Sequence, residues 1–197
     1  KGVEVTNLSE KEYNKIRMEI GMVFQGGALF DSMTVAENVA FVLNEFMDLD
    51  KKTVADKVVD ALALVGLKGI ENMMPSKLSG GMKKRVSLAR VLCMEPHIIL
   101  YDEPTSEVDP ITADAINNLI IELRDKLKVT SIIVTHDMNA AYKVADSIAM
   151  FYHGHVIADG RPDEIRNSTH PVVKQFIHGE AEGPITEDEN LVFGHIK

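Results

Sequence analysis

Two short groups of residues, one helix apart, have types and spacings that suit nucleotide chemistry. Ser79-Gly80-Gly81 forms a turn before a helix-like segment, and the unpaired N–H groups at a helix start attract anions. Four apolar residues, 98–101, precede Asp102 and Glu103. This pattern predicts a buried strand that ends in two carboxylates, at the strand end where α/β sheets bind ligands. An exposed acidic turn is the alternative, and the apolar run before the acids counts against it.

Two further polar residues follow segments that are predicted to be strands. Gln25 follows the short apolar strand 20–24, and His136 follows the β-branched strand 130–135. Gln25 resembles the Q-loop glutamine of ABC-type ATPases, and residues 78–82 resemble their LSGGQ signature. Residues 98–103 resemble the Walker B strand, and His136 resembles the switch histidine. These motifs occur along the chain in the family's order. Residues 105–109 resemble the D-loop. The resemblance covers nearly the whole chain. It implies an α/β fold of the P-loop NTPase (RecA-like) type, a parallel sheet with an inserted helical subdomain.

The resemblance also implies roles for individual residues around ATP and Mg²⁺. Adjacent strand residues face opposite ways, so Asp102 would hold Mg²⁺ through water and Glu103 would polarise the attacking water. Gln25 would contact Mg²⁺ and that water, and His136 would contact the γ-phosphate. A surface-turn glutamine and a packing histidine are the alternative interpretations of these two residues.

The signature and the D-loop are expected to act across a dimer. Ser79, Gly80 and Gly81 would bind the nucleotide held by the partner subunit, and Ser106 and Asp109 would connect the two sites. Two departures from the family pattern stand out. Met82 replaces the usual Gln, so contacts there must come from Ser79 and backbone amides. Glu107 replaces a small residue. Asp109 before Pro110 is also a sound helix N-cap, and the sequence does not separate this from the D-loop role.

A phosphate loop of the form G-x-x-x-x-G-K-[S/T] does not occur in the sequence. In the family that loop precedes the Q-loop and grips the β- and γ-phosphates. We therefore expect an N-terminally truncated chain that by itself binds ATP weakly and does not hydrolyse it. Strands ending near Phe24, Tyr101 and Thr135 should form the sheet, with the edge beside the third exposed or filled by an unusual element.

The predicted organisation has four parts. They are a core fragment with the Q-loop (residues 1–33), the helical subdomain with the signature (34–94), the core with Walker B, D-loop and switch histidine (95–178), and an acidic, extended tail (179–197). Ser9 with Glu12 and Thr34 with Glu37 form capping boxes that begin helices.

Two groups on the predicted helical subdomain have more than one interpretation. Lys83, Lys84 and Arg85 crowd the first turn of the signature helix, either as a solvated basic face or as positive potential near a nucleotide. Met73 and Met74 either fill gaps in the core or line a groove for a membrane subunit.

Composition limits the possible partners and location. The 197 residues carry a net charge of −9, with 45% hydrophobic and 26% charged residues and one cysteine. The negative charge argues against nucleic-acid binding, and one cysteine excludes an internal disulfide, as suits a reducing compartment. No apolar run approaches the ~20 residues of a membrane span. A membrane role must therefore come through a partner, and we expect a cytoplasmic protein, peripheral on the inner face of the cytoplasmic membrane.

Several stretches resemble one subfamily, the ATPases of Mla/Mce-type phospholipid transporters. They are residues 26–30, 74–75, 109–112, 175–179 and 183–184, together with Met82. The resemblance implies a homodimer of ATPase subunits that drives a membrane permease, and indirectly a lipid-binding Mce-type protein. The alternatives are an ABC ATPase for another substrate, a soluble one acting on nucleic acid or ribosomes, and a non-catalytic interaction module.

Overall fold

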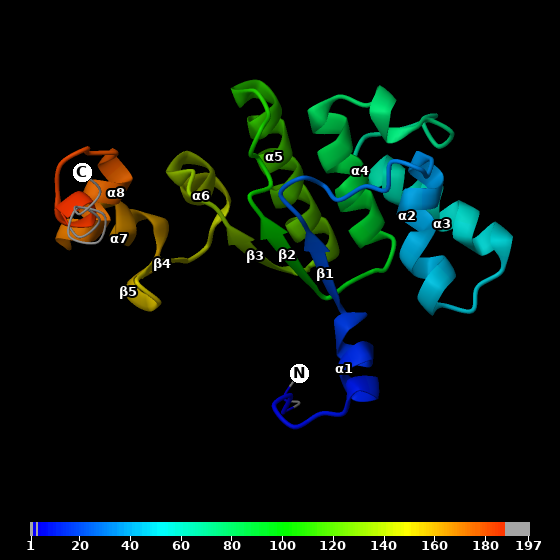
Figure 1. The fold of residues 1–197 in the computed structure, drawn as a ribbon, viewed down its shortest axis with the longest axis horizontal. Helices are drawn as coiled ribbons and strands as arrows, with labels where there is room; N and C mark the ends of the chain where they lie inside the picture. The colour runs from blue at the N-terminus through cyan, green and yellow to red at the C-terminus, as the bar shows by residue number, and fades with distance from the viewer. Residues whose placement is uncertain (1, 3, 188–197) are drawn as a thin grey trace, which may run out of the picture. The chain divides into compact units, whose positions relative to one another are not determined.

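The computed structural model describes residues 2 and 4–187, and they form two compact units that divide between His136 and Asp137. The first unit holds a three-stranded sheet with helices (Figure 1). Its elements are α1 (Glu10–Arg17), β1 (Ile20–Val23), α2 (Val35–Phe46), α3 (Lys51–Leu64), the 3₁₀ turn η1 (Pro75–Lys77), α4 (Gly80–Leu92), β2 (Ile98–Asp102), α5 (Pro110–Leu127) and β3 (Thr130–Val134).

The sheet is parallel, as predicted, in the order β1-β2-β3. Met22 pairs with Leu100 and Leu100 with Ile132, so these three side chains form one row across the sheet. Gly21 faces the other way, because a Cβ there would lie 2.1 Å from Val91 Cγ1 of α4. This close approach lets α4 pack directly on β1, and a side chain at this position would separate them.

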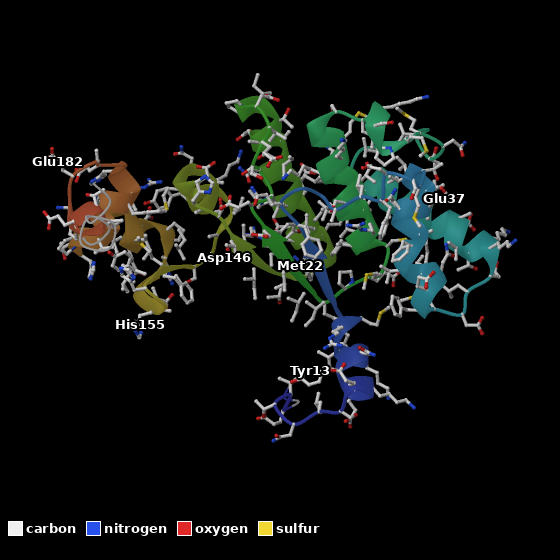
Figure 2. The ribbon with its side chains drawn as sticks, in the orientation of Figure 1. Tyr13, Met22, Glu37, Asp146, His155 and Glu182 are labelled. Atoms are coloured by element: carbon white, nitrogen blue, oxygen red, sulfur yellow. The ribbon has the colours of Figure 1, made fainter. Side chains whose placement is uncertain are left out.

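One face of the sheet packs against the helices and the other is open within the described residues. Val23, Ile99 and Tyr101 are buried in the core cluster, which also includes residues of α4 and α5. On the opposite face Met22, labelled in Figure 2, is exposed. Ile132 and Val134 of the edge strand β3 are 54% and 60% exposed. Among the described residues β3 is an edge strand of this sheet, as expected, and these exposed side chains lie on one face of it.

The helices α2, α3 and α4 pack on one another within the segment 34–94, beside the sheet in Figure 1. Thr34 is the N-cap of α2 and forms the predicted capping box with Glu37. Glu37 N donates to Thr34 Oγ1 at 3.2 Å, and Thr34 N donates to Glu37 Oε2 at 2.7 Å. Asp50 caps α3 through the N–H groups of Lys52 and Thr53. Met73 packs against the core, which favours the packing interpretation for this residue.

The second unit contains α6 (Met138–Val144), the antiparallel pair β4 (Ile148–Tyr152) and β5 (His155–Gly160), α7 (Pro162–Arg166) and α8 (Pro171–His178). The predicted hairpin turns at His153 and Gly154, whose φ angles are 46° and 79°. Two successive residues with positive φ are typical of the tight turns that match strand twist. Among the described residues, no helix combines the length and apolar composition that a membrane span requires.

The first part of the acidic tail differs from the expected extended chain. Buried Gln175 of α8 donates to Glu180 O and Thr186 Oγ1, each at 3.2 Å, and accepts from Ile185 N at 2.7 Å. One amide side chain therefore holds the chain back against α8. Asp188, Glu189 and the rest of the tail lie outside the described residues.

A fully buried asparagine of α2 organises the loop after Gln25. Asn38 Oδ1 accepts from Phe30 N at 2.8 Å, and its Nδ2 donates to the carbonyl oxygens of Phe30, Met33 and Thr34 at 3.0–3.1 Å. These bonds satisfy the polar atoms of the amide and anchor a loop that has no secondary structure of its own.

We expect Asn38→Ala to lower the free energy of unfolding by about 2–3 kcal/mol, because it removes the side-chain partner of Phe30 N and Met33 O and opens a space in the core. Asn44→Ala, on the exposed side of α2, is the matched control and should change the value by less than about 0.5 kcal/mol. Urea denaturation measures both. Equal effects of the two substitutions would contradict the anchoring role of Asn38.

Candidate functional site

The parallel sheet places three of the predicted site residues just beyond the ends of neighbouring strands. Gln25 follows β1, Glu103 follows β2 and His136 follows β3, while Asp102 is the last residue of β2. Since parallel strands end at the same edge of a sheet, these four residues share that edge. Glu103 N donates to Val134 O at 2.9 Å, which continues the pairing of β2 with β3 into the site.

The structure brings Glu103 and His136 into direct contact. Glu103 Oε1 accepts from His136 N at 2.9 Å and lies 2.7 Å from His136 Nδ1, and Oε2 accepts from Thr135 Oγ1 at 3.2 Å. The Glu103 side chain is 16% exposed and that of His136 is 77% exposed. A carboxylate offers about four acceptor positions. The carboxylate is therefore held in one orientation and keeps acceptor capacity on Oε2.

Glu103 has a left-handed backbone, with φ of 45°. A non-glycine residue in this region costs of order 1–3 kcal/mol and persists only where its surroundings hold it. Ser106 supplies part of that support, because its Oγ donates to Glu103 O at 2.9 Å and its N–H donates to the same oxygen at 3.2 Å. Ser106, in the segment predicted to be the D-loop, thus bonds to the peptide that carries the predicted catalytic carboxylate.

The predicted metal ligands are hard oxygen donors. Asp102 is half-buried at the strand end and Gln25 is exposed on the loop after β1. The described residues contain no group of three or more His, Cys, Asp or Glu arranged around one point. Mg²⁺ in nucleotide sites is held by one or two protein oxygens together with phosphate oxygens and water, not by an all-protein cage. The donor set therefore fits Mg²⁺, with Asp102 and Gln25 as the residues that would hold it.

The signature turn is accessible from outside the molecule. Ser79 caps α4 by accepting from Met82 N at 3.3 Å, and both Ser79 and Gly80 are exposed.

Asp109 caps α5 by accepting from the N–H groups of Ile111 and Thr112 at 3.0 Å each and from Thr112 Oγ1 at 2.5 Å. The bonds from Thr112 and Ile111 lower the pKa of Asp109.

Two buried cations of α4 contact the loop after β1, and their carbonyl partners were not predicted from the sequence. Lys84 Nζ contacts Gln25 O, Ser106 Oγ at 3.2 Å and Glu103 O at 3.4 Å. Arg90 donates to Ala28 O at 2.7 Å and Gly27 O at 3.0 Å.

The interpretation as a solvated basic face is wrong for Lys84, because this residue is only 7% exposed and its ammonium group is bound by protein oxygens. The alternative, a positive potential near a nucleotide, stays a prediction. Burial lowers its pKa, and the nearby carboxylates of Glu107, Glu103 and Asp102 oppose that shift. One signal in the sequence could have identified Arg90. It lies within the run Val86–Cys93, whose other members are apolar or small, so its charge requires internal partners.

Comparison with known proteins identifies the family and the fold of the chain. Residues 2–106 match the family model described as "ABC transporter". The chain belongs to the ABC transporter family. A solved structure with 30% sequence identity, the dimeric ATP-binding cassette MJ0796 in a post-hydrolysis state bound to ADP and Pi, aligns with a TM-score of 0.71 over 81% of this chain and 70% of that one. This confirms the predicted P-loop NTPase-type α/β fold with a parallel sheet.

Curated relatives carry different substrate names. The probable ribonucleotide transport ATP-binding protein mkl of Mycobacterium tuberculosis is 40% identical over 188 residues, which are 95% of this chain and 52% of that protein. The intermembrane phospholipid transport system ATP-binding protein MlaF of Haemophilus influenzae is 38% identical over 184 residues, which are 93% of this chain and 70% of that protein. The chain therefore spans about half the length of the mycobacterial relative.

The two signature glycines differ in what surrounds them. A Cβ on Gly80 would lie 3.6 Å from Val108 Cγ1, an ordinary contact, whereas one on Gly81 would lie 2.6 Å from Thr112 Cγ2 of α5. Thr112 has little freedom to move away, because its χ1 is restricted by β-branching and its hydroxyl is bonded to Asp109. Gly81 is therefore required by the packing of α4 on α5.

We expect Gly81→Ala to lower the free energy of unfolding by about 1–3 kcal/mol through this overpacking. Adding Thr112→Ser should restore most of the loss, because it removes Cγ2 and keeps the hydroxyl that bonds Asp109. Gly80→Ala is the control and should leave the unfolding free energy within about 0.5 kcal/mol of the parent. Chemical denaturation of the four proteins checks the set, and a double variant as unstable as Gly81→Ala would refute the stated cause.

Proposed function

We propose that this chain is part of the ATP-hydrolysing subunit of an ABC transporter, working as a homodimer on a membrane permease. The observation that carries the proposal is the carboxylate of Glu103, positioned beyond β2 by Thr135 and His136 next to Asp102. A non-catalytic module would have no need to hold a carboxylate in this way on a left-handed backbone. Membership of the ABC transporter family supports the same conclusion.

The residues of the site divide the chemistry of ATP hydrolysis among them. Glu103 orients the attacking water through the free acceptor position on Oε2 and takes up its proton there. His136 holds Oε1 and presents an exposed imidazole toward the γ-phosphate. Asp102 and Gln25 would hold Mg²⁺, which would neutralise charge on the phosphates. The exposed Ser79 and Gly80, together with the half-buried Gly81, bind the nucleotide of the partner subunit, and Ser106 and Asp109 connect the two sites.

The finer proposal is that the transported substrate is a phospholipid, as in Mla/Mce-type systems, with an Mce-type protein as an indirect partner. The 38% identity to MlaF and the similar stretches around Met82 and residues 26–30 support it. A second substrate class is favoured by the 40% identity to a relative named for ribonucleotide transport. The proposed location is the cytoplasmic side of the membrane, where the permease would bring the subunit to the bilayer surface.

In the full-length protein, Glu103→Gln should give a dimer stabilised by ATP, because binding is kept while proton uptake from water is lost. Light scattering with chromatography in Mg²⁺-ATP measures the assembly, and phosphate release should fall by at least about 100-fold. Glu122→Gln, an exposed change on α5, is the matched control and should hydrolyse ATP normally. A Glu103→Gln protein that stays monomeric at saturating ATP with its permease present would contradict the shared-site mechanism.

The substrate class is tested with the full-length protein and its permease in liposomes. We expect ATP-dependent transfer of a fluorescent phospholipid to acceptor vesicles, and Glu103→Gln should abolish it. The control measures uptake of radiolabelled ribonucleotide by the same liposomes, which should not exceed the level without ATP. ATP-dependent ribonucleotide uptake without lipid transfer would replace the phospholipid proposal by the second one.

A further inference from the structure

Lys84 is a buried cation whose partners come from three separate segments. It lies on α4, one turn after the signature residues Ser79–Gly81. Its Nζ contacts the carbonyl oxygen of Gln25 after β1, the carbonyl oxygen of Glu103 after β2, and Oγ of Ser106 in the D-loop. These are the segments that carry the proposed catalytic and communicating residues. A single ammonium group therefore bonds to all three from the helix that begins with the signature.

We propose that Lys84 is a positioning residue for ATP hydrolysis, which sets Gln25 and Glu103 relative to the signature turn. The proposal rests on the function proposed above. Lys84 does not touch nucleotide or water in this role. It fixes the peptides from which the Gln25 and Glu103 side chains extend.

The backbone of Glu103 explains why such support matters. Its left-handed φ of 45° has to be maintained by the surroundings. The carbonyl of this residue accepts from Ser106 Oγ, from Ser106 N and from Lys84 Nζ. Loss of Lys84 would remove the donor that comes from outside the β2–α5 connection. The carboxylate would then be less precisely placed, although its bonds to Thr135 and His136 remain.

Arg90 shows that the contacts of Lys84 are specific. Both cations are buried on α4 and both bind carbonyl oxygens of the loop after β1. Arg90 binds Gly27 and Ala28, whereas Lys84 also reaches Glu103 and Ser106. Arg90 therefore ties α4 to one loop, and Lys84 ties that loop to the end of β2. If the first turn of α4 moved, Lys84 would shift the backbone at Gln25 and at Glu103 together.

The test compares ATP hydrolysis by full-length Lys84→Met and wild type in complex with the permease. Methionine keeps an unbranched side chain of similar volume and removes Nζ. We expect kcat to fall by about 10- to 100-fold, the range that a small misplacement of catalytic groups produces. KM for ATP should change by less than about threefold, because groups that act only in the transition state lower kcat without raising KM. Lys84→Gln keeps a donor without the charge and should recover at least a third of the lost activity.

Three controls separate positioning from folding and from general charge. Lys83→Met removes the same charge one residue earlier, where none of the three contacts is made, and should keep kcat within about twofold of wild type. Thermal unfolding shows whether each variant is folded at the assay temperature. The double variant Ser106→Ala with Lys84→Met should lower kcat by a factor smaller than the product of the factors found for the two single variants. The reason is that the two side chains bond to each other and to Glu103 O.

The possible outcomes distinguish this inference from the proposed function. A folded Lys84→Met with wild-type kcat, or with a loss seen only as a raised KM, overturns the positioning role. Equal losses in Lys83→Met and Lys84→Met also overturn it, because they would reflect charge alone. If Lys84→Met does not fold, Lys84→Gln decides by the same kcat and KM criteria. Wild-type hydrolysis by Glu103→Gln would instead refute the proposed function itself.

Discussion

Parallel hydrogen bonding among β1, β2 and β3 determines where the residues of the candidate site lie. The register pairs Val23 with Tyr101 and Tyr101 with Ile133, so the three strands end at the same level. Gln25, Asp102, Glu103 and His136 are therefore brought to one edge of the sheet by backbone bonds alone. The bond from Glu103 N to Val134 O extends the pairing of β2 with β3 one residue beyond the end of β2. Side-chain bonds then select the orientation of each group, as the contacts of His136 and Thr135 with Glu103 show.

The helices that position the site were predicted well because their start signals are local. Thr34 with Glu37 and Asp109 before Pro110 are patterns of two to four residues, and both cap helices where expected. The strands were visible as short apolar runs, and their parallel pairing followed from the family resemblance. Exposure of Ser79 and Gly80 agrees with a turn that meets another molecule. The assignments of individual roles within the ATPase cycle remain predictions that the proposed experiments test.

Other parts of the site could not be predicted because their partners are distant in sequence. Lys84 contacts the carbonyl of a residue 59 positions away, and Arg90 contacts one 62 positions away. A lysine in a helical pattern shows its charge but not whether a carbonyl will lie against it. The first turn of α4 contains three cations, and only the packed structure shows that one of them points inward. Asn38 and Gln175 are similar cases, since each amide bonds to loop backbone that has no pattern of its own.

The same packing of α4 isolates the single thiol of the chain. Cys93 caps the C-terminal end of α4, is 3% exposed, and burial raises its pKa to about 11. Since the thiolate is the reactive form of cysteine, this side chain is protected from alkylating reagents while the helix stays packed. Its labelling rate under native conditions therefore reports how often the helix that carries the signature separates from its surroundings. A chain with one cysteine thus contains its own reporter of local opening.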